Sequence, residues 1–267
     1  MNKEIFDLFI EQGFADCGTV AFDKVKIKPV QNAKNVIIAV MPYFYEKSEN
    51  QNLCMYASLI NYHTYITEKL IKIIKKLIKI YPDNFFNAYC DSSPIQEKKA
   101  AVIAEMGYFG KNQLFIHKKY GSFVFLGEII TDLDMETSNG EKIPCEMCGA
   151  CVKACPSGAI TENGFNLNLC ISAITQKKDS LTMQEAELLQ KNGSAWGCDH
   201  CQDCCPHNKN LPESEIAKTN RLENLYYEDI YKLNETEFQE KYKNRAFTWR
   251  GRDVLVRNLR LLEQSNL

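Results

Sequence analysis

The chain has 267 residues, enough for one large domain or two smaller domains with cores of their own. Apolar residues make up 45% and charged residues 25%, a mixture typical of globular proteins and not of disordered chains. The formal net charge of −2 excludes a strongly basic protein, so any nucleic-acid surface must be a local patch. The longest apolar run, residues 36–41, is too short to cross a bilayer and no signal peptide is visible, so we expect a cytoplasmic protein that binds no membrane.

The N-terminal half predicts a helix, two strands and a longer helix. Residues 2–12 have the spacing of an amphipathic helix, and residues 18–22 and 35–43 predict strands, the second buried and ended by Pro42. Residues 56–80 predict one long helix whose second half carries lysines at helical spacing: Lys69, Lys72, Lys75, Lys76 and Lys79. An ordinary solvated helix face is the favoured interpretation of these lysines, and a phosphate-binding face is the alternative.

The middle of the chain predicts further strands, and the C-terminal part is helical by pattern. A helix is expected from Pro94 to about residue 106, and two strands around a turn are expected within residues 113–131. Further helices are expected near residues 181–191 and over most of residues 214–267.

Two groups of cysteines carry the strongest chemical signal. Cys145, Cys148, Cys151 and Cys155 are spaced by two, two and three residues and are followed by a proline, which is the ligand run of bacterial ferredoxins. A second group of Cys198, Cys201 and Cys205 also ends in a proline. Because disulfides are rare in the cytoplasm, twelve cysteines in this chain argue for metal ligation.

Two four-iron clusters need eight thiolates, and Cys170, between the two groups, is the best candidate for the eighth. In such proteins the fourth cysteine of a run binds the other cluster. The first cluster is therefore expected on Cys145, Cys148, Cys151 and Cys205, and the second on Cys155, Cys170, Cys198 and Cys201. Cys204 could replace Cys205, although the proline that follows favours Cys205.

Zinc is the alternative metal, but zinc sites take four ligands, usually as two CxxC pairs. Cys17, Cys54 and Cys90 lie outside both groups and are expected to be plain buried residues.

The chain as a whole resembles the epoxyqueuosine reductases, which are cobalamin-dependent iron–sulfur enzymes that complete the queuosine modification in tRNA. The residues that carry the resemblance are 90–133, 145–160, 169–178, 196–209 and 247–262. A more distant resemblance joins them to the reductive dehalogenases, which also pair two clusters with a corrinoid.

The resemblance implies an α+β fold in three parts. Residues 1–137 would form an α/β cobalamin-binding catalytic domain, residues 138–212 a ferredoxin-like double [4Fe-4S] domain, and residues 213–267 a helical segment packing on the core. Many relatives continue into a C-terminal helical-repeat domain, so the chain is expected to be a short form with less tRNA-binding surface. A monomer and an external low-potential electron donor are also expected.

The resemblance also assigns site residues. Asp91 matches the proton donor, and the positions that match cobalamin contacts are Cys54, Phe115, Leu126, Ile130, Ile171 and Ser172. A carboxyl in an apolar site has a raised pKa and can stay protonated as a general acid, which is the state expected of Asp91. The alternative for Asp91 is a helix N-cap or an Asx turn, which the following Ser-Ser-Pro would suit.

The function implied is reduction of epoxyqueuosine to queuosine in tRNA, with electrons passing through the two clusters to the corrinoid. A corrinoid reductase of another substrate, a free nucleoside or an organohalide, is one alternative, and a two-cluster electron-transfer protein is another. Seven basic residues could contact tRNA phosphates or could pair with local acidic residues: Lys177, Lys178, Arg245, Arg250, Arg252, Arg257 and Arg260.

Overall fold

The longest apolar run of the sequence forms an inner strand of an antiparallel sheet. The computed structural model describes residues 3–141, 143–218 and 221–264, and its contacts divide the chain into two units. The sheet unit comprises Met1–Tyr43, Tyr62–Met147 and His207–Pro212, and the helical unit comprises Phe44–Asn61, Cys148–Pro206 and Glu213–Leu267. This packing groups the chain differently from the three parts expected above, whose bounds as domains stay a prediction.

The main sheet has the strand order β1-β2-β6-β3, with every neighbouring pair antiparallel. Its strands are β1 (Asp16–Ala21), β2 (Asn35–Pro42), β3 (Phe86–Tyr89) and β6 (Val124–Thr131). The two strands expected within residues 113–131 exist, but they do not pair with each other. Instead β5 (Phe115–His117) pairs with β4 (Gly107–Phe109), and β6 pairs with β2 and β3.

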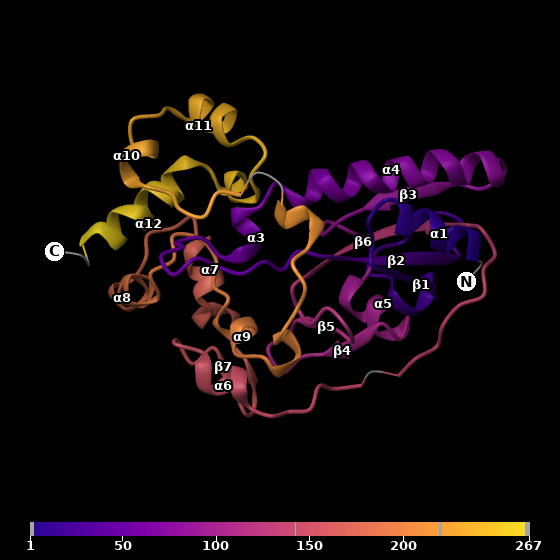
Figure 1. Ribbon diagram of the computed structural model, residues 1–267, viewed down its shortest axis with the longest axis horizontal. Helices are drawn as coiled ribbons and strands as arrows, with labels where there is room; N and C mark the ends of the chain where they lie inside the picture. The colour runs from indigo at the N-terminus through magenta and orange to yellow at the C-terminus, as the bar shows by residue number, and fades with distance from the viewer. Residues whose placement is uncertain (1–2, 142, 219–220, 265–267) are drawn as a thin grey trace. The chain divides into compact units, whose positions relative to one another are not determined.

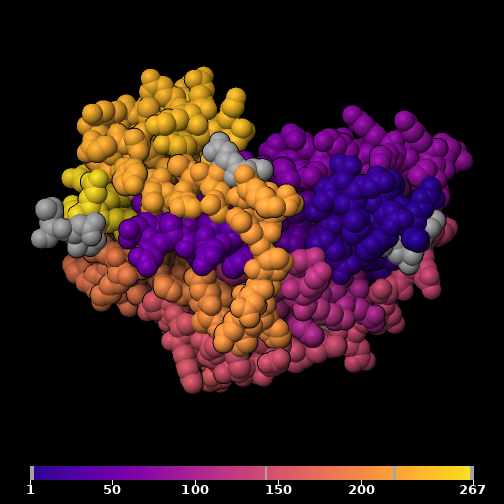
Figure 2. All heavy atoms as spheres, in the orientation of Figure 1, coloured from indigo at the N-terminus to yellow at the C-terminus, as the bar shows by residue number. Residues whose placement is uncertain are grey.

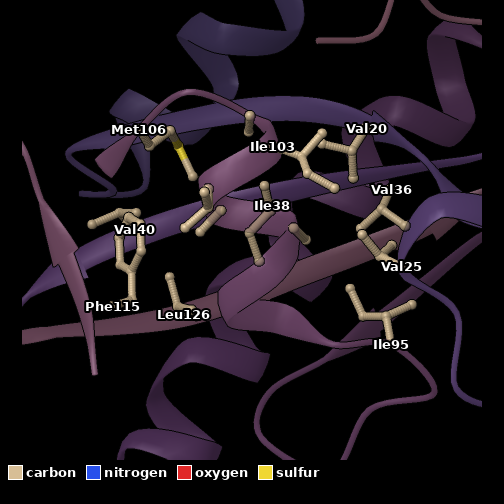
Figure 3. Packing of buried hydrophobic residues seen from close by; sticks show 14 of the residues in the cluster. Val20, Val25, Val36, Ile38, Val40, Ile95, Ile103, Met106, Phe115 and Leu126 are labelled. Carbon is tan, nitrogen blue, oxygen red and sulfur yellow. The ribbon is translucent and has the colours of Figure 1, made fainter. Parts of the chain in front are cut away.

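Helices cover both faces of this sheet (Figure 1). Helix α4 (Tyr62–Ile80) lies on one face, where a Cβ on Gly127 would come within 2.6 Å of Ile66 Cγ2, so the glycine allows the close approach. Helix α5 (Glu97–Ile103) lies on the other face over the core shown in Figure 3. Helices α1 (Lys3–Glu11) and α2 (Phe22–Val25) complete the unit. The expected N-terminal helix is confirmed, apart from residue 2, which lies outside the described residues.

The lysines of α4 form an ordinary helix face. Ile66, Leu70, Ile73 and Leu77 bury the opposite side of the helix. Lys76 forms an ion pair with Glu11, at 2.5 Å, and Lys69 donates to the Gln12 carbonyl at 2.7 Å. The solvated face favoured from the sequence is therefore confirmed, and part of it fastens α4 to the end of α1.

Two helix predictions were wrong in their bounds because tertiary contacts take the backbone groups. The helix expected over residues 56–80 is two helices, α3 (Met55–Ser58) and α4, since the Ser58 carbonyl accepts from the buried Arg245 guanidinium at 2.8 Å. Helix α5 begins at Glu97 and not at Pro94, whose carbonyl accepts from the amides of Ile27 and Lys28.

The helical unit buries Trp196, Phe238 and Phe247 in a core of its own. The segment 44–61 passes through this unit, with Cys54 N bonded to the Trp196 carbonyl and Asn52 Nδ2 to the Leu225 carbonyl, and Figure 2 shows its purple atoms among orange ones. The remaining helices and strands are α6 (Ala150–Ala154), β7 (Ile160–Thr161), β8 (Gly164–Phe165), η1 (Leu167–Leu169), α7 (Ile171–Thr175), α8 (Met183–Asn192), α9 (His200–Asp203), η2 (Pro206–Asn208), η3 (Glu215–Lys218), α10 (Tyr227–Ile230), α11 (Glu235–Tyr242), η4 (Ala246–Arg250) and α12 (Arg252–Gln264).

The helices expected near residues 181–191 and within residues 214–267 are thus confirmed, as is the α+β class. Helix α8 starts with a capping box, in which the Thr182 hydroxyl accepts from the Glu185 amide and the Glu185 carboxylate accepts from the Thr182 amide. None of the described helices is long and apolar enough to cross a membrane.

Candidate active site and cluster cysteines

Asp91 lies on a tight turn directly after β3. The Ser92 amide donates to the Cys90 carbonyl and the Ser93 amide to the Asp91 carbonyl, each at 2.9 Å. This turn holds Asp91 at φ = 65°, in the left-handed region that Asp and Asn enter more readily than other non-glycine residues. Such backbone outliers cluster at functional sites, which makes the turn a candidate site in its own right.

The Asp91 carboxylate is held by two side chains from the start of α4. His63 Nε2 lies 3.0 Å from Asp91 Oδ2, and the Tyr62 hydroxyl donates to the same oxygen at 3.3 Å. The Asp91 side chain is 56% exposed, so it is open to a ligand. Helix α5 has Gln96 as its N-cap, so the helix-capping alternative for Asp91 is wrong.

The state expected for the Asp91 carboxyl is also wrong. The hydrogen bond from His63 lowers the pKa of Asp91, and it outweighs the partial burial that raises it. The carboxylate is therefore ionised at neutral pH in this structure. The sequence suggested apolar surroundings, but it did not reveal that His63, 28 residues earlier, would lie against the carboxylate.

Stacked rings fix the position of these two partners. Tyr62 stacks on Phe125 with ring centroids 4.4 Å apart and planes 5° apart, and on its neighbour His63 at 4.0 Å. Tyr43 covers the other face of Phe125 at 4.1 Å. The start of α4 is thus anchored to β6 through aromatic contacts, which keeps His63 beside Asp91.

Two further carboxyls lie close to Asp91 and were not identified from the sequence. Glu97 begins α5 and Glu128 lies in β6, and burial raises the pKa of Glu97 to about 7 and that of Glu128 to about 8. The sequence did carry one signal, since Glu128 is the only charge in the apolar strand VFLGEIIT.

The expected cobalamin contacts of the sheet unit are packed together. Phe115, Leu126 and Ile130 belong to one core cluster, and Figure 3 shows Phe115 beside Leu126 at one end of it. Leu126 and Ile130 share a face of β6, because alternate residues of a strand point the same way. Ile130 is completely buried, so a ligand could contact it only by displacing part of the core.

The other expected contacts lie in the helical unit. Cys54 is buried and Ile171 is the first residue of α7, directly after Cys170. Ser172 is half-buried, and its carbonyl accepts from the side chains of Thr175 and Gln176 at 3.0 and 2.9 Å. These three assignments, like those in the sheet unit, stay predictions.

The cysteines expected to hold the second cluster lie near one another. Burial, with smaller contributions from the neighbouring Asp199, Cys170 and Cys155, raises the pKa of Cys198 to about 12. Three of the four expected ligands therefore face one region although 43 residues separate the first from the last. Cys17, Cys54 and Cys90 are buried and free, as expected.

Ligands expected for the first cluster show a similar grouping. Burial raises the pKa of Cys204, and the nearby thiols of Cys151 and Cys205 add to this. Cys204 thus lies near both Cys151 and Cys205, and the choice between Cys204 and Cys205 stays open. Among the described residues, no three His, Cys, Asp or Glu side chains are grouped tightly enough to bind a single metal ion.

Comparison with known proteins gives this arrangement a family. Residues 144–208 match a family described as a 4Fe-4S double cluster binding domain. An epoxyqueuosine reductase from Synechocystis is 32% identical over 248 residues, covering 88% of this chain and 84% of the relative. The chain belongs to the epoxyqueuosine reductase family. An epoxyqueuosine reductase from Listeria monocytogenes is 34% identical over 203 residues.

The chain spans little more than half the length of some epoxyqueuosine reductases that it matches. The shares covered are 53% for the Listeria protein, 57% for one from Lactococcus garvieae and 58% for one from Aliivibrio fischeri. The match to the double cluster domain lies in this chain itself, at residues 144–208.

Solved structures of epoxyqueuosine reductases share the fold. One from Bacillus subtilis, described with its catalytic aspartate loop swung out of the active site, has a TM-score of 0.84 at 22% identity, covering 97% of this chain and 80% of that one. Another, solved with an epoxyqueuosine-modified tRNA stem loop, has a TM-score of 0.81 at 23% identity with the same coverage. A reductive dehalogenase structure described in terms of B12-dependent dehalogenation has a TM-score of 0.56 at 14% identity, covering 98% of this chain and 35% of that one.

Proposed function

We propose that this chain is an oxidoreductase that converts epoxyqueuosine to queuosine in tRNA. The observation that carries the proposal is the presence, in one chain of this family, of an exposed Asp91 carboxylate on a left-handed turn and a double 4Fe-4S cluster domain. The reaction removes the epoxide oxygen as water and leaves an alkene. It needs an acid at the oxygen and a source of single electrons, and these two features supply them.

The cysteine grouping fits two four-iron clusters. Cys155, Cys170 and Cys198 are neighbours, as are Cys151, Cys204 and Cys205, and a four-iron cluster spreads its four thiolates around a group of atoms larger than one ion. The first cluster would be held by Cys145, Cys148, Cys151 and Cys205, and the second by Cys155, Cys170, Cys198 and Cys201. An external low-potential donor would load them.

We assign cobalamin as the second cofactor, held by Phe115, Leu126, Ile130, Cys54, Ile171 and Ser172. The apolar pair of Phe115 and Leu126 suits the edge of a corrin ring, and the fold shared with a reductive dehalogenase described as B12-dependent supports the assignment. When bound, cobalamin supplies a strongly reducing centre for the epoxide carbon. The protein's own residues supply position and protons.

Asp91 would give a proton to the departing oxygen. In this structure His63 keeps the carboxylate ionised, and covering its exposed side with cofactor and substrate would remove water and raise its pKa toward a state that can hold a proton. Tyr62 and His63 orient the carboxyl throughout. The solved relative described with a swung-out catalytic aspartate loop supports this role for a turn of this kind.

A local surface of the helical unit, formed by Trp249 and Arg250, suits tRNA. Arg245 and Arg257 donate to main-chain carbonyls, Arg245 to that of Ser58 and Arg257 to those of Lys177 and Asp179, so both guanidinium groups take part in bonds within the helical unit. Trp249 is 59% exposed with the Arg250 guanidinium 3.6 Å above its ring. An exposed ring with a cation beside it suits base stacking.

The decisive experiment is an anaerobic turnover assay. The chain is reconstituted with iron, sulfide and cobalamin, given a chemical reductant and tRNA carrying epoxyqueuosine, and queuosine is measured after digestion to nucleosides. Conversion is expected on tRNA. If only the free nucleoside is converted, the substrate is the nucleoside and not tRNA. Cobalamin binding is followed by its visible spectrum, and if cobalamin does not bind, the electron-transfer alternative is favoured. The monomeric state and the cytoplasmic location stay predictions.

A further inference from the structure

Reduction of an epoxide to an alkene and water consumes two electrons and two protons. One proton must reach the oxygen as the carbon–oxygen bonds break, and a second converts the resulting hydroxide to water. Asp91 can hold only one, and His63 keeps it ionised in this structure. A second proton store must therefore lie near Asp91 or the site must take each proton from bulk water.

Glu128 is an unusual residue for an inner strand. It is completely buried in β6, opposite Ile38 of β2 and Tyr89 of β3, and neither of its carboxylate oxygens has a hydrogen-bond partner. Ser93 lies close enough to favour the charged form without a well-aligned bond. A charged carboxylate left unpaired in such a place is costly, so the group holds a proton.

Glu97 connects this buried group to Asp91. Its carboxylate accepts a hydrogen bond from the Asp91 backbone amide, while its Oε2 is buried without a partner. Among the charged groups that raise the pKa of Glu128, Glu97 has a larger effect than Asp91. The three carboxyls therefore form a short series from the exposed Asp91 through Glu97 to the buried Glu128.

The charges around this series favour protons on the two glutamates. Burial first and the charge of Asp91 second raise the pKa of Glu97, to about 7, against the opposing effects of Lys98 and His63. Burial first, and then the charges of Glu97 and Asp91, raise the pKa of Glu128 to about 8. The other titratable neighbours, Tyr62 and Cys90, are neutral because burial raises the pKa of each well above its ordinary value.

We propose that Glu97 and Glu128 are a proton-holding pair that returns a proton to Asp91 within each turnover. Asp91, which takes up a proton from water as substrate binds, protonates the leaving oxygen. Glu97 then protonates Asp91, Glu128 restores the proton on Glu97, and Asp91 delivers the second proton to form water. Bulk water returns a proton to Glu128 before the next turnover, so two protons enter for the two consumed. The two electrons come from the external donor through the bound cofactors. The inference rests on the proposed reductase function, and it makes Glu97 and Glu128 positioning residues that act through Asp91.

The test compares Glu97→Gln and Glu128→Gln with Glu68→Gln, an exposed glutamate on α4. Glutamine at position 97 keeps an oxygen for the Asp91 amide but holds no proton. Wild-type kcat is expected to fall as pH rises through about 7 to 8. Glu97→Gln should lower kcat about 100-fold at neutral pH with KM within about twofold and with no fall in this range. Glu128→Gln should lower kcat about tenfold, while Glu68→Gln matches wild type.

A second readout does not depend on turnover. The infrared band of protonated carboxyls should be present in the wild-type protein at pH 6, disappear between pH 7 and 9, and be reduced in each of the two variants. Absence of any carboxyl titrating in this range would overturn the proposal even if the enzyme is active. A wild-type protein that shows the band but reduces no epoxyqueuosine would refute the proposed function and leave the pair as a proton store for another reaction. Unchanged kcat and pH profile in both variants would also overturn the proposal.

Discussion

The sheet around Asp91 and the chain from residue 145 to residue 170 bury very different amounts of apolar side chain. In β2 seven of eight residues are buried, and both faces of the sheet are covered by helices. Between residues 145 and 170 only Ala159 and Ile160 are buried, and α6 buries none of its residues. Hydrophobic packing accounts for the sheet, whereas the cysteine-rich segment lacks enough of it to be stable alone. We therefore expect the clusters to stabilise this segment as well as to carry electrons.

The largest expected effect comes from removing a cluster ligand. Cys198→Ser should lower the iron content after reconstitution from about eight to about four atoms per chain and abolish turnover, because the second cluster loses a thiolate. Hydrogen exchange should quicken over residues 145–170 and stay slow in β2. Cys204→Ser is the control that should keep its iron. If Cys204→Ser loses iron while Cys205→Ser keeps it, Cys204 and not Cys205 is the ligand of the first cluster.

The next largest effect is expected at Asp91. Asp91→Asn keeps the left-handed turn, which Asn also tolerates, but offers no proton, so turnover should fall about 10²–10⁴-fold. Iron content, the cobalamin spectrum and protection of the sheet amides should stay as in wild type. Full activity in this variant would show that another group protonates the oxygen.

A smaller effect is expected on the stability of the sheet. The folded-state pKa of Glu128, about 8, lies above its ordinary value, so the folded protein binds more protons than the unfolded chain between about pH 5 and 8. The free energy of opening should therefore fall as pH rises through that range, by on the order of 4 kcal/mol. Glu128→Gln should remove the part of this dependence that comes from Glu128 and leave the smaller part that comes from Glu97, whose pKa is about 7. The measurement is hydrogen exchange of the β2 and β6 amides at pH 6 and 8.5. If the free energy of opening falls equally with pH in the variant and in wild type, a group other than Glu128 titrates in this range.

The smallest effect is expected at the exposed aromatic surface of the helical unit. Trp249→Ala should weaken tRNA binding about tenfold, because stacking of one base contributes about 1–3 kcal/mol. Turnover at saturating tRNA should not change. Arg260→Ala, an exposed basic residue on α12, is the comparison that separates ring stacking from charge. Equal losses for the two variants would mean that charge alone accounts for the binding.

Sequence reasoning worked where chemistry depends on one residue type at fixed spacing. The cysteine run indicated two clusters directly, and the buried strands and C-terminal helices followed from their apolar periods. It failed where side chains distant in sequence meet, as when His63 reverses the expected pKa shift of Asp91. It also missed Glu97 and Glu128, because which glutamate is buried depends on register, here Glu128 opposite Ile38. The break after Ser58 has the same cause, a bond from Arg245 in a distant part of the chain.

The left-handed backbone of Asp91 has a consequence for any survey of tolerated substitutions. At φ = 65° a β-branched or bulky residue is strained whatever its chemistry, and Gly, Asn and Asp fit best. Position 91 would therefore score as intolerant in a saturation mutagenesis library for two separate reasons, shape and acidity. Asp91→Asn and Asp91→Gly separate the two reasons, because both residues fit the backbone and neither supplies an acid. Loss of activity in both variants would therefore be due to the missing acid and not to backbone strain. Glutamate, the usual conservative replacement, would confuse the two.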